Sequence, residues 1–289
     1  MWKEFKYIPD KTSFKDQETD STGDIESKDI GKKKLKESKK ILREVQDKLY
    51  AHDKYAVLIV FQAMDAAGKD STIKHVMSGV NPQGCYVKSF KKPSSEELDH
   101  DFLWRCYKEL PERGMIGIFN RSYYEEVLIT KVHPDVLNYQ KLPGFDIKNI
   151  NKDFWNSRYD DINNFEKHLV ENGTIVLKFF LNVSQKEQKK RFLDRINNPA
   201  KNWKFTLNDL NERQYWEKYM DAYKDILNKT STDYAPWYVI PADHKWFMRM
   251  VVCDIIIDQM KSLSLEYPEV DEKQKEELIK AKDILESED

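Results

Sequence analysis

The stretch A-M-D-A-A-G-K-D-S at residues 63–71 combines flexible backbone, a lysine and two acids in a spacing suited to holding phosphate groups. It matches the pattern G-x-x-x-x-G-K-[ST] with two departures, because Ala63 replaces the first glycine and Asp70 replaces the hydroxyl residue. In such a loop the backbone N–H groups and the following helix start form an anion site, and Lys69 reaches the outer phosphates. We expect the cradle to include Ala66, Ala67, Gly68 and Ser71. A turn that leads into a solvated helix start is the alternative interpretation.

Two carboxylates, Asp65 and Asp70, lie within this loop. They would repel a polyanion unless a cation lay between them, so the sequence predicts one or two Mg²⁺ ions, or Mn²⁺ in their place, with both acids as ligands. A phosphate acceptor is already mostly ionised near neutral pH, since its last pKa is about 6. Asp65 is therefore better interpreted as a metal ligand or an orienting group than as a proton acceptor. Asp70 as an ordinary acid in a first helical turn is the alternative.

A second polar cluster, F-N-R-S-Y-Y-E-E at residues 119–126, follows a short apolar run. Asn120 stands where many phosphate-loop proteins carry a second acidic metal ligand, and Arg121 offers a rigid fork suited to phosphate. Glu125 and Glu126 could bind metal or face the acceptor. A solvated first turn of a helix explains these two acids equally well.

The segment 184–205 is strongly basic, with seven Lys and Arg residues against two acids. Arg191 and Arg195 are four residues apart and would share one helical face beside Lys190. Cationic groups that close over a transferring phosphoryl group supply much of the stabilisation in such chemistry. We therefore expect a lid at about 184–206 that delivers Lys190, Arg191 and Arg195, with Arg191 acting in catalysis. A charged surface helix is the alternative.

These groups must be positioned by the elements between them. The run Y-A-V-L-I-V-F-Q at 55–62 is typical of a strand buried on both faces. Similar runs lie at 85–90, 115–120, 174–182 and 236–240. Helical stretches are expected at 32–52, 94–110, 153–171, 207–227 and 245–262. Alternation of five strands with helices predicts an α/β fold with a doubly wound, five-stranded parallel sheet.

The two ends of the chain differ from the middle. Residues 1–31 are polar and predict a loosely held N-terminal arm, 32–263 form the main domain, and 264–289 form an acidic C-terminal tail. From 266 onward there are ten acidic and four basic residues, which favours a mobile helical tail.

Composition excludes several classes of partner. Charged residues make up 34% of the chain, yet the net charge is -2, so we expect no nucleic-acid partner. No apolar run reaches the roughly 20 residues needed to span a bilayer, which predicts no membrane association. Three cysteines lie far apart in the sequence and form no C-x-x-C pair, which suits a cytoplasmic protein.

The chain resembles the polyphosphate kinases of the second type from about residue 32 to 263. The resemblance rests on A-M-D-A-A-G-K-D, H-V-M-S-G-V-N-P-Q-G-C, D-H-D-F-L-W-R, I-G-I-F-N-R-S-Y-Y-E-E, K-N-W-K-F and A-P-W-Y-V-I-P-A-D-H-K-W-F. It implies a phosphate-loop kinase fold similar to thymidylate kinase, with a helical lid. Asp65, Lys69 and Arg121 match the family's catalytic positions, while Lys190, Arg191 and Arg195 fall in its lid.

The resemblance also implies the reaction. Polyphosphate would lie along a basic channel and the nucleotide would enter from the opposite side. This chain has N-R-S-Y-Y-E where the diphosphate-specific branch has D-R-S-W-Y-N, which resembles the class III branch that acts on nucleoside mono- and diphosphates. We therefore expect reversible transfer from inorganic polyphosphate to AMP and ADP, by a homodimer or homotetramer. An ATP-dependent nucleoside monophosphate kinase and a non-catalytic polyphosphate- or nucleotide-binding module are the alternatives.

Overall fold

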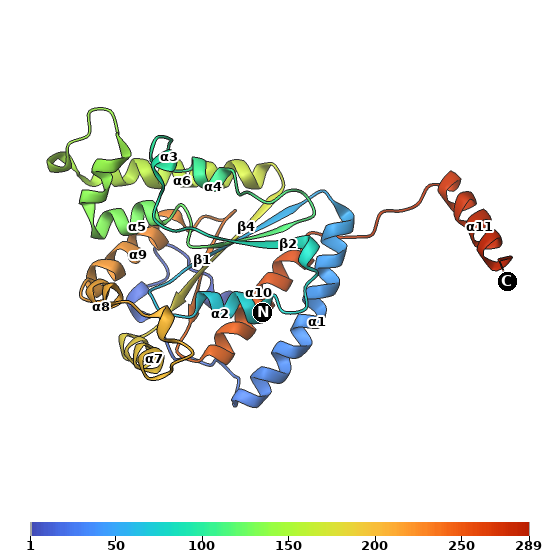
Figure 1. Cartoon of the computed structure of the whole chain (residues 1–289), viewed down its shortest axis with the longest axis horizontal. Coiled ribbons are helices and arrows are strands. Elements are labelled where there is room, and N and C mark those ends of the chain that lie inside the picture. Colours follow the sequence, from blue (N-terminus) through green and yellow to red (C-terminus); the bar gives the residue numbers. More distant parts are fainter. Residues whose placement is uncertain (1, 289) are drawn as a thin grey trace.

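The centre of the computed structural model, which describes residues 2–288, is a parallel sheet of five strands in the order β2-β3-β1-β4-β5. The strands are β1 (Ala56–Gln62), β2 (Cys85–Ser89), β3 (Ile116–Asn120), β4 (Thr174–Asn182) and β5 (Trp237–Pro241). All seven residues of β1 are buried, as its uninterrupted apolar sequence predicts. The prediction of a five-stranded, doubly wound α/β fold is confirmed (Figure 1).

Helices cover both faces of the sheet. On one side α1 (Lys28–His52) and α2 (Lys69–Val76) pack together with α10 (Lys245–Lys261), and on the other α5 (Glu125–Val132), α6 (Lys152–Glu171) and α9 (Trp216–Thr230) pack against one another (Figure 1). The remaining longer helix near the sheet is α7 (Gln185–Asn197), which follows β4. The chain passes from β1 toward one edge and later returns to the other side of β1. In sheets of this kind the ligand lies at the carboxyl end of the strands, where this reversal occurs.

Two of the expected helices are broken in the structure. The segment 94–110 forms only the short helices α3 (Ser95–Leu98) and α4 (Trp104–Tyr107), and 207–227 divides into α8 (Leu207–Arg213) and α9. The first break has a physical cause, because Asp101 folds its carboxylate back onto the backbone N–H of Leu103 at 2.9 Å.

The N-terminal arm is tied to the domain, in contrast to the loosely held arm that the sequence predicts. The Tyr7 N–H donates to the Trp237 carbonyl at 2.8 Å beside an antiparallel bridge to the edge strand β5. Farther along, the Asn182 amide donates to the Gln17 carbonyl at 3.0 Å, and the Asp243 N–H donates to the Thr19 carbonyl at 2.9 Å. Thus the arm covers β5 and contacts the ends of β4 and β5.

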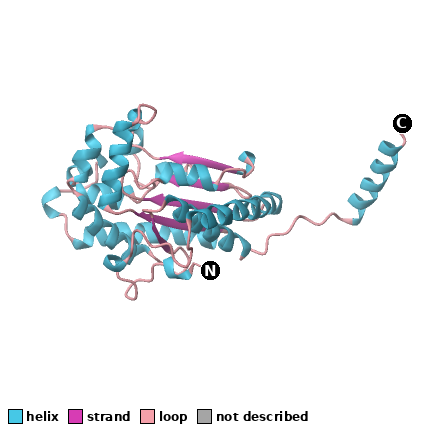
Figure 2. Ribbon diagram, turned by 90° about the horizontal axis from the view of Figure 1, so that it is seen from below, coloured by secondary structure: helices cyan, strands magenta, loops and turns pink. Residues whose placement is uncertain are grey.

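The C-terminal tail extends away from the domain. It contains the helix α11 (Glu272–Glu286), none of whose residues is buried. Figures 1 and 2 both show α11 separated from the other helices by an extended segment. Within the described residues no helix combines the length and the apolar character that crossing a membrane requires.

Candidate functional site

The predicted phosphate cradle lies between the end of β1 and the start of α2. Gly68 caps α2 with a φ of 113° and Ala66 has a φ of 62°, so two residues of the loop have left-handed backbone. Only glycine takes up such a conformation without strain, which explains Gly68, whereas the strained Ala66 is typical of a functional loop. Ala66 and Ala67 are buried. The Ser71 hydroxyl donates to the Gly68 carbonyl at 3.1 Å and closes the turn.

The second polar cluster lies directly beside this loop because of strand register. Phe61 of β1 is paired with Asn120 of β3, so both strands end at the same level of the sheet. Arg121 then turns with a φ of 63°, and its N–H donates to the Phe61 carbonyl at 3.1 Å. Its guanidinium Nη2 donates to Asp65 Oδ1 at 3.2 Å. The structure therefore brings together the two motifs that the sequence singles out.

The two loop carboxylates occupy different surroundings. Asp65 pairs with Arg121 and is one-third exposed. Asp70 is exposed and accepts a hydrogen bond from the Asn120 amide at 2.6 Å. Both line the same cavity as Lys69. Between residues 2 and 288 no three His, Cys, Asp or Glu side chains form a metal-binding group. Two carboxylates beside a phosphate cradle nevertheless fit Mg²⁺, which usually takes one or two carboxylates together with water and substrate phosphate oxygens.

Lys69 is held inside the loop. Its Nζ donates to the Ala63 carbonyl at 2.7 Å. Burial lowers the pKa of Lys69 to about 8, and the nearby Arg121 acts in the same direction. Desolvation raises the pKa of Glu125, against the opposing effects of Arg121 and Lys69. Glu125 lines a small cavity together with Asp65 and Arg121, next to the phosphate loop.

Arg191 lies beneath the phosphate loop. Its side chain is 6% exposed, and its two Nη atoms donate to the carbonyls of Ala66, Ala67 and Ala242 at 3.1, 2.5 and 2.6 Å. A further bond joins its Nε to Glu187 at 2.9 Å. With these donors occupied, Arg191 holds the loop against the start of α10. The sequence prediction of a lid arginine that reaches over the substrate does not anticipate this position.

Other lid residues face the open side of the cradle. A cavity of about 590 Å³, the phosphate cavity, is lined by the loop, by Asn120 and Arg121, and by Arg195, Lys201 and Lys204 from the lid. Lys190, by contrast, is 80% exposed and lies 3.6 Å from Glu187. Of the three predicted lid cations, Arg191 and Arg195 both line this cavity, and because Arg191 bonds the loop carbonyls, Arg195 is the better placed to contact a phosphate there.

Glu126 points away from the cradle. Its side chain is 10% exposed, lies 3.7 Å from Arg158 Nη1 and accepts a hydrogen bond from Gln140. It lines a separate small cavity between α4, α6 and the segment that follows α5. Glu125 and Glu126, which the sequence predicts as a pair, thus line different cavities. Adjacent residues of a helix point in different directions around its axis.

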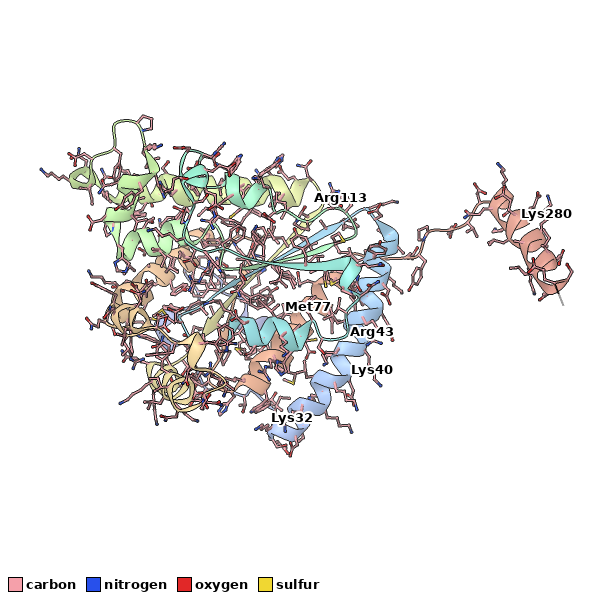
Figure 3. The ribbon with its side chains drawn as sticks, in the orientation of Figure 1. Lys32, Lys40, Arg43, Met77, Arg113 and Lys280 are labelled. Atoms are coloured by element: carbon pink, nitrogen blue, oxygen red, sulfur yellow. The ribbon has the colours of Figure 1, made fainter. Side chains whose placement is uncertain are left out.

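A basic groove adjoins the phosphate cavity. It has a volume of about 750 Å³, and eight Lys and Arg side chains against three acids line it. The basic members are Lys28, Lys32, Lys36, Lys39, Lys190, Arg191, Lys245 and Arg249. Figure 3 labels Lys32 near the N-terminal end of α1 and Lys40 farther along the same helix. The groove and the phosphate cavity share Arg191, Asp194 and Lys245, so they form one continuous basic surface.

Sequence reasoning missed the α1 lysines, although a signal was present. Lys28, Lys32, Lys36 and Lys39 recur at intervals of four or three residues, which places them on one helical face. The lysine row borders the apolar face of the same helix, which packs on α10, and the apolar residue Leu35 lines the same groove.

Comparison with known proteins gives consistent matches over most of the chain. The family model described as polyphosphate kinase 2 matches residues 25–268. An "ADP-polyphosphate phosphotransferase" of Rhodopseudomonas palustris is 53% identical over 90% of this chain and 89% of its own length. An "AMP/ADP-polyphosphate phosphotransferase" of Meiothermus ruber is 43% identical over 79% of this chain and 80% of its own length. The crystal structure of polyphosphate kinase 2 from Arthrobacter aurescens superposes with a TM-score of 0.86 at 38% identity, covering 94% of each chain.

Proposed function

Because the chain belongs to the polyphosphate kinase 2 family, we propose that it transfers a phosphoryl group from inorganic polyphosphate to AMP and ADP, giving ADP and ATP, in a reversible reaction. The observation that carries this proposal is the continuity between the phosphate cavity and the basic groove. A nucleoside triphosphate would need only the cradle, whereas a long chain of phosphates needs cations along its whole path. The names of the two relatives support polyphosphate as the donor and both nucleotides as acceptors.

The donor would lie with its terminal phosphate in the cradle and its remaining length along α1. An oxygen of the acceptor's last phosphate attacks the terminal phosphorus, the bond to the bridging oxygen breaks, and the shortened polyphosphate leaves as an anion. Lys69 and Arg121 bind oxygens of the transferring group, and Arg195 approaches from the lid. Because the reaction needs little covalent help from the protein, positioning and charge stabilisation account for most of the rate.

Asp65 and Asp70 would hold Mg²⁺ at this site, or Mn²⁺ in its place. When bound, the ion would neutralise negative charge on the phosphate oxygens and on the two acids. Asp65 otherwise orients Arg121 through their ion pair of 3.2 Å. The Asn120 amide plays the same part toward Asp70, which it contacts at 2.6 Å. We also propose that the protein is cytoplasmic and assembles as a homodimer or homotetramer.

Product analysis with AMP and ADP as separate acceptors tests this function. With polyphosphate and Mg²⁺ as the only other components, AMP should yield ADP and then ATP, and ADP should yield ATP. If neither ADP nor ATP is formed, the proposal is refuted. Rapid use of ATP upon addition of AMP, with no response to polyphosphate, would instead identify an ATP-dependent nucleoside monophosphate kinase.

A further inference from the structure

A fully buried ion pair lies within the domain, beneath the turn that carries Arg121. Lys178 of β4 and Glu166 of α6 have no exposed side-chain surface, and Lys178 Nζ lies 2.5 Å from Glu166 Oε2. The ammonium also donates to the Tyr124 hydroxyl oxygen at 2.9 Å and to the Thr230 carbonyl at 2.7 Å. All three donors of Lys178 are therefore used.

The same carboxylate anchors the turn after β3. The hydroxyls of Tyr123 and Tyr124 both donate to Glu166 Oε1 at 2.8 Å. Burial raises the pKa of both tyrosines well above the usual value, and the charge of Glu166 acts in the same direction, so both hydroxyls keep their protons. These tyrosines follow Arg121 by two and three residues in the sequence N-R-S-Y-Y-E.

A contribution to stability does not by itself explain why this buried network is present. Replacing a buried ion pair with apolar side chains of similar size is often neutral or stabilising, because the pair must first be stripped of water. Arg121, however, has the left-handed φ of 63°, and a residue so strained persists only where its surroundings hold it. Closer to the backbone, the Ser122 hydroxyl oxygen accepts hydrogen bonds from the Gln62 amide at 3.3 Å and from the Tyr124 N–H at 3.2 Å, and the Arg121 N–H donates to the Phe61 carbonyl at 3.1 Å.

We propose that Glu166, Lys178, Tyr123 and Tyr124 are positioning residues that hold the Arg121 turn at the geometry needed for phosphoryl transfer. Glu166 accepts hydrogen bonds from both tyrosine hydroxyls, and the ion pair with Lys178 holds the Glu166 carboxylate in place. The turn that follows β3 is thereby fixed in position relative to β4 and α6. The proposal rests on the proposed function, because it assigns these residues to the reaction at the same site.

The variant Tyr123→Phe/Tyr124→Phe tests the proposal with minimal change in packing. We expect kcat for AMP phosphorylation to fall about tenfold or more while KM for polyphosphate stays within about twofold, since the misplaced group acts on the reacting phosphoryl. Tyr7→Phe is the matched control, because the Tyr7 hydroxyl also donates a 2.8 Å bond, to Asn228, and neither residue lines the cavity at the phosphate loop. It should leave kcat unchanged. Equal kcat in the wild type and the double variant would overturn the proposal.

A second variant removes the ion pair itself. Glu166→Leu/Lys178→Met replaces both charges with apolar side chains, but it leaves the Tyr123 and Tyr124 hydroxyls without their acceptor and the Thr230 carbonyl without the Lys178 donor. We therefore expect a lower unfolding midpoint than in the wild type and, in the folded protein, a kcat that falls as in the tyrosine variant. A folded variant with wild-type kcat would contradict the positioning role. If either double variant does not fold, the single variant Tyr124→Phe decides by the same kcat criterion.

The wild-type protein distinguishes this proposal from the function on which it rests. If the wild type forms no product from polyphosphate, the proposed function fails. If the wild type is active and the variants match it, only the positioning role fails.

Discussion

Lys69 loses its charge at a lower pH than an ordinary lysine. Its pKa is lowered to about 8, first by burial and then by Arg121. Only the protonated amine attracts phosphate, and the protonated fraction falls as pH rises through the pKa. We therefore predict that kcat/KM for polyphosphate, which reports on the free enzyme, declines above about pH 8. Bound polyphosphate favours the charged form, so kcat should decline only at higher pH.

Steady-state rates between about pH 6 and 10, a range roughly centred on the Lys69 pKa, check this prediction. A kcat/KM that stays flat through this range would show that the charge of Lys69 does not govern donor binding.

Arg191 illustrates what residue type and spacing can and cannot predict. The basic segment predicts arginines near the phosphate loop, and Arg191 and Arg195 line the cavity beside that loop. Which of the two bonds the loop carbonyls depends on the angle at which α7 packs, and no local pattern encodes that angle. Since Arg191 is 6% exposed and satisfies carbonyls of the loop, its charge supports the loop from behind.

The variant Arg191→Met should therefore destabilise the fold. It leaves buried carbonyl oxygens of the loop without donors, and we expect the free energy of unfolding to fall by about 3 kcal/mol or more. Lys190→Met is the matched control, because Lys190 is the adjacent residue and its side chain is 80% exposed. Urea denaturation of both variants gives the comparison, and equal stabilities would contradict the role assigned to Arg191.

At the scale of elements, α1 supplies one wall of the groove. Lys32 and Lys36 line it, whereas Lys33 and Lys40 of the same helix do not. We predict that Lys32→Ala/Lys36→Ala raises KM for long polyphosphate about fivefold or more, because each lost ion pair weakens binding by up to about 1 kcal/mol. Triphosphate, which is short enough for the cradle alone, should be affected little.

The control Lys33→Ala/Lys40→Ala removes the same charge from the same helix. Initial rates with long polyphosphate and with triphosphate measure both variants. Equal effects of the two double variants would mean that only the overall charge matters and that the groove does not guide the donor.

The elements were predicted most reliably where burial alone decides their form. Four strands, β1, β3, β4 and β5, are almost entirely buried and follow from apolar runs, whereas the edge strand β2 is partly exposed, and all five appear within a few residues of their expected positions. The helices expected at 94–110 and 207–227 are each divided in two in the structure, and the sequence did not predict either break. At the first break the Asp101 carboxylate bonds the backbone and competes with helical periodicity, and the periodicity itself carries no sign of that competition.

At the scale of the whole molecule, the two ends of the chain differ in their attachment. Phe5 and Tyr7 of the arm are buried, whereas every residue of α11 is exposed. Ending the chain at Glu269 should leave the unfolding midpoint and kcat unchanged. Removing the first 20 residues should lower the free energy of unfolding by about 3 kcal/mol or more, because two buried aromatic side chains are lost.

Thermal unfolding and the rate of ADP formation measure both truncations. A large loss of stability upon removal of α11 would show that this helix packs on the domain. The sequence does not predict the attachment of the arm, because the arm is polar in composition and joins the domain through backbone hydrogen bonds to β5 and Asp243 as well as through a few buried aromatic side chains.

The most direct test of the account is the rate at which Lys69→Ala forms ADP from AMP and polyphosphate, compared with the wild type under the same conditions. We predict that this variant folds with an unfolding midpoint close to that of the wild type but forms no detectable ADP. A folded Lys69→Ala protein that retains wild-type turnover would show that the reaction takes place outside the cavity at the end of β1.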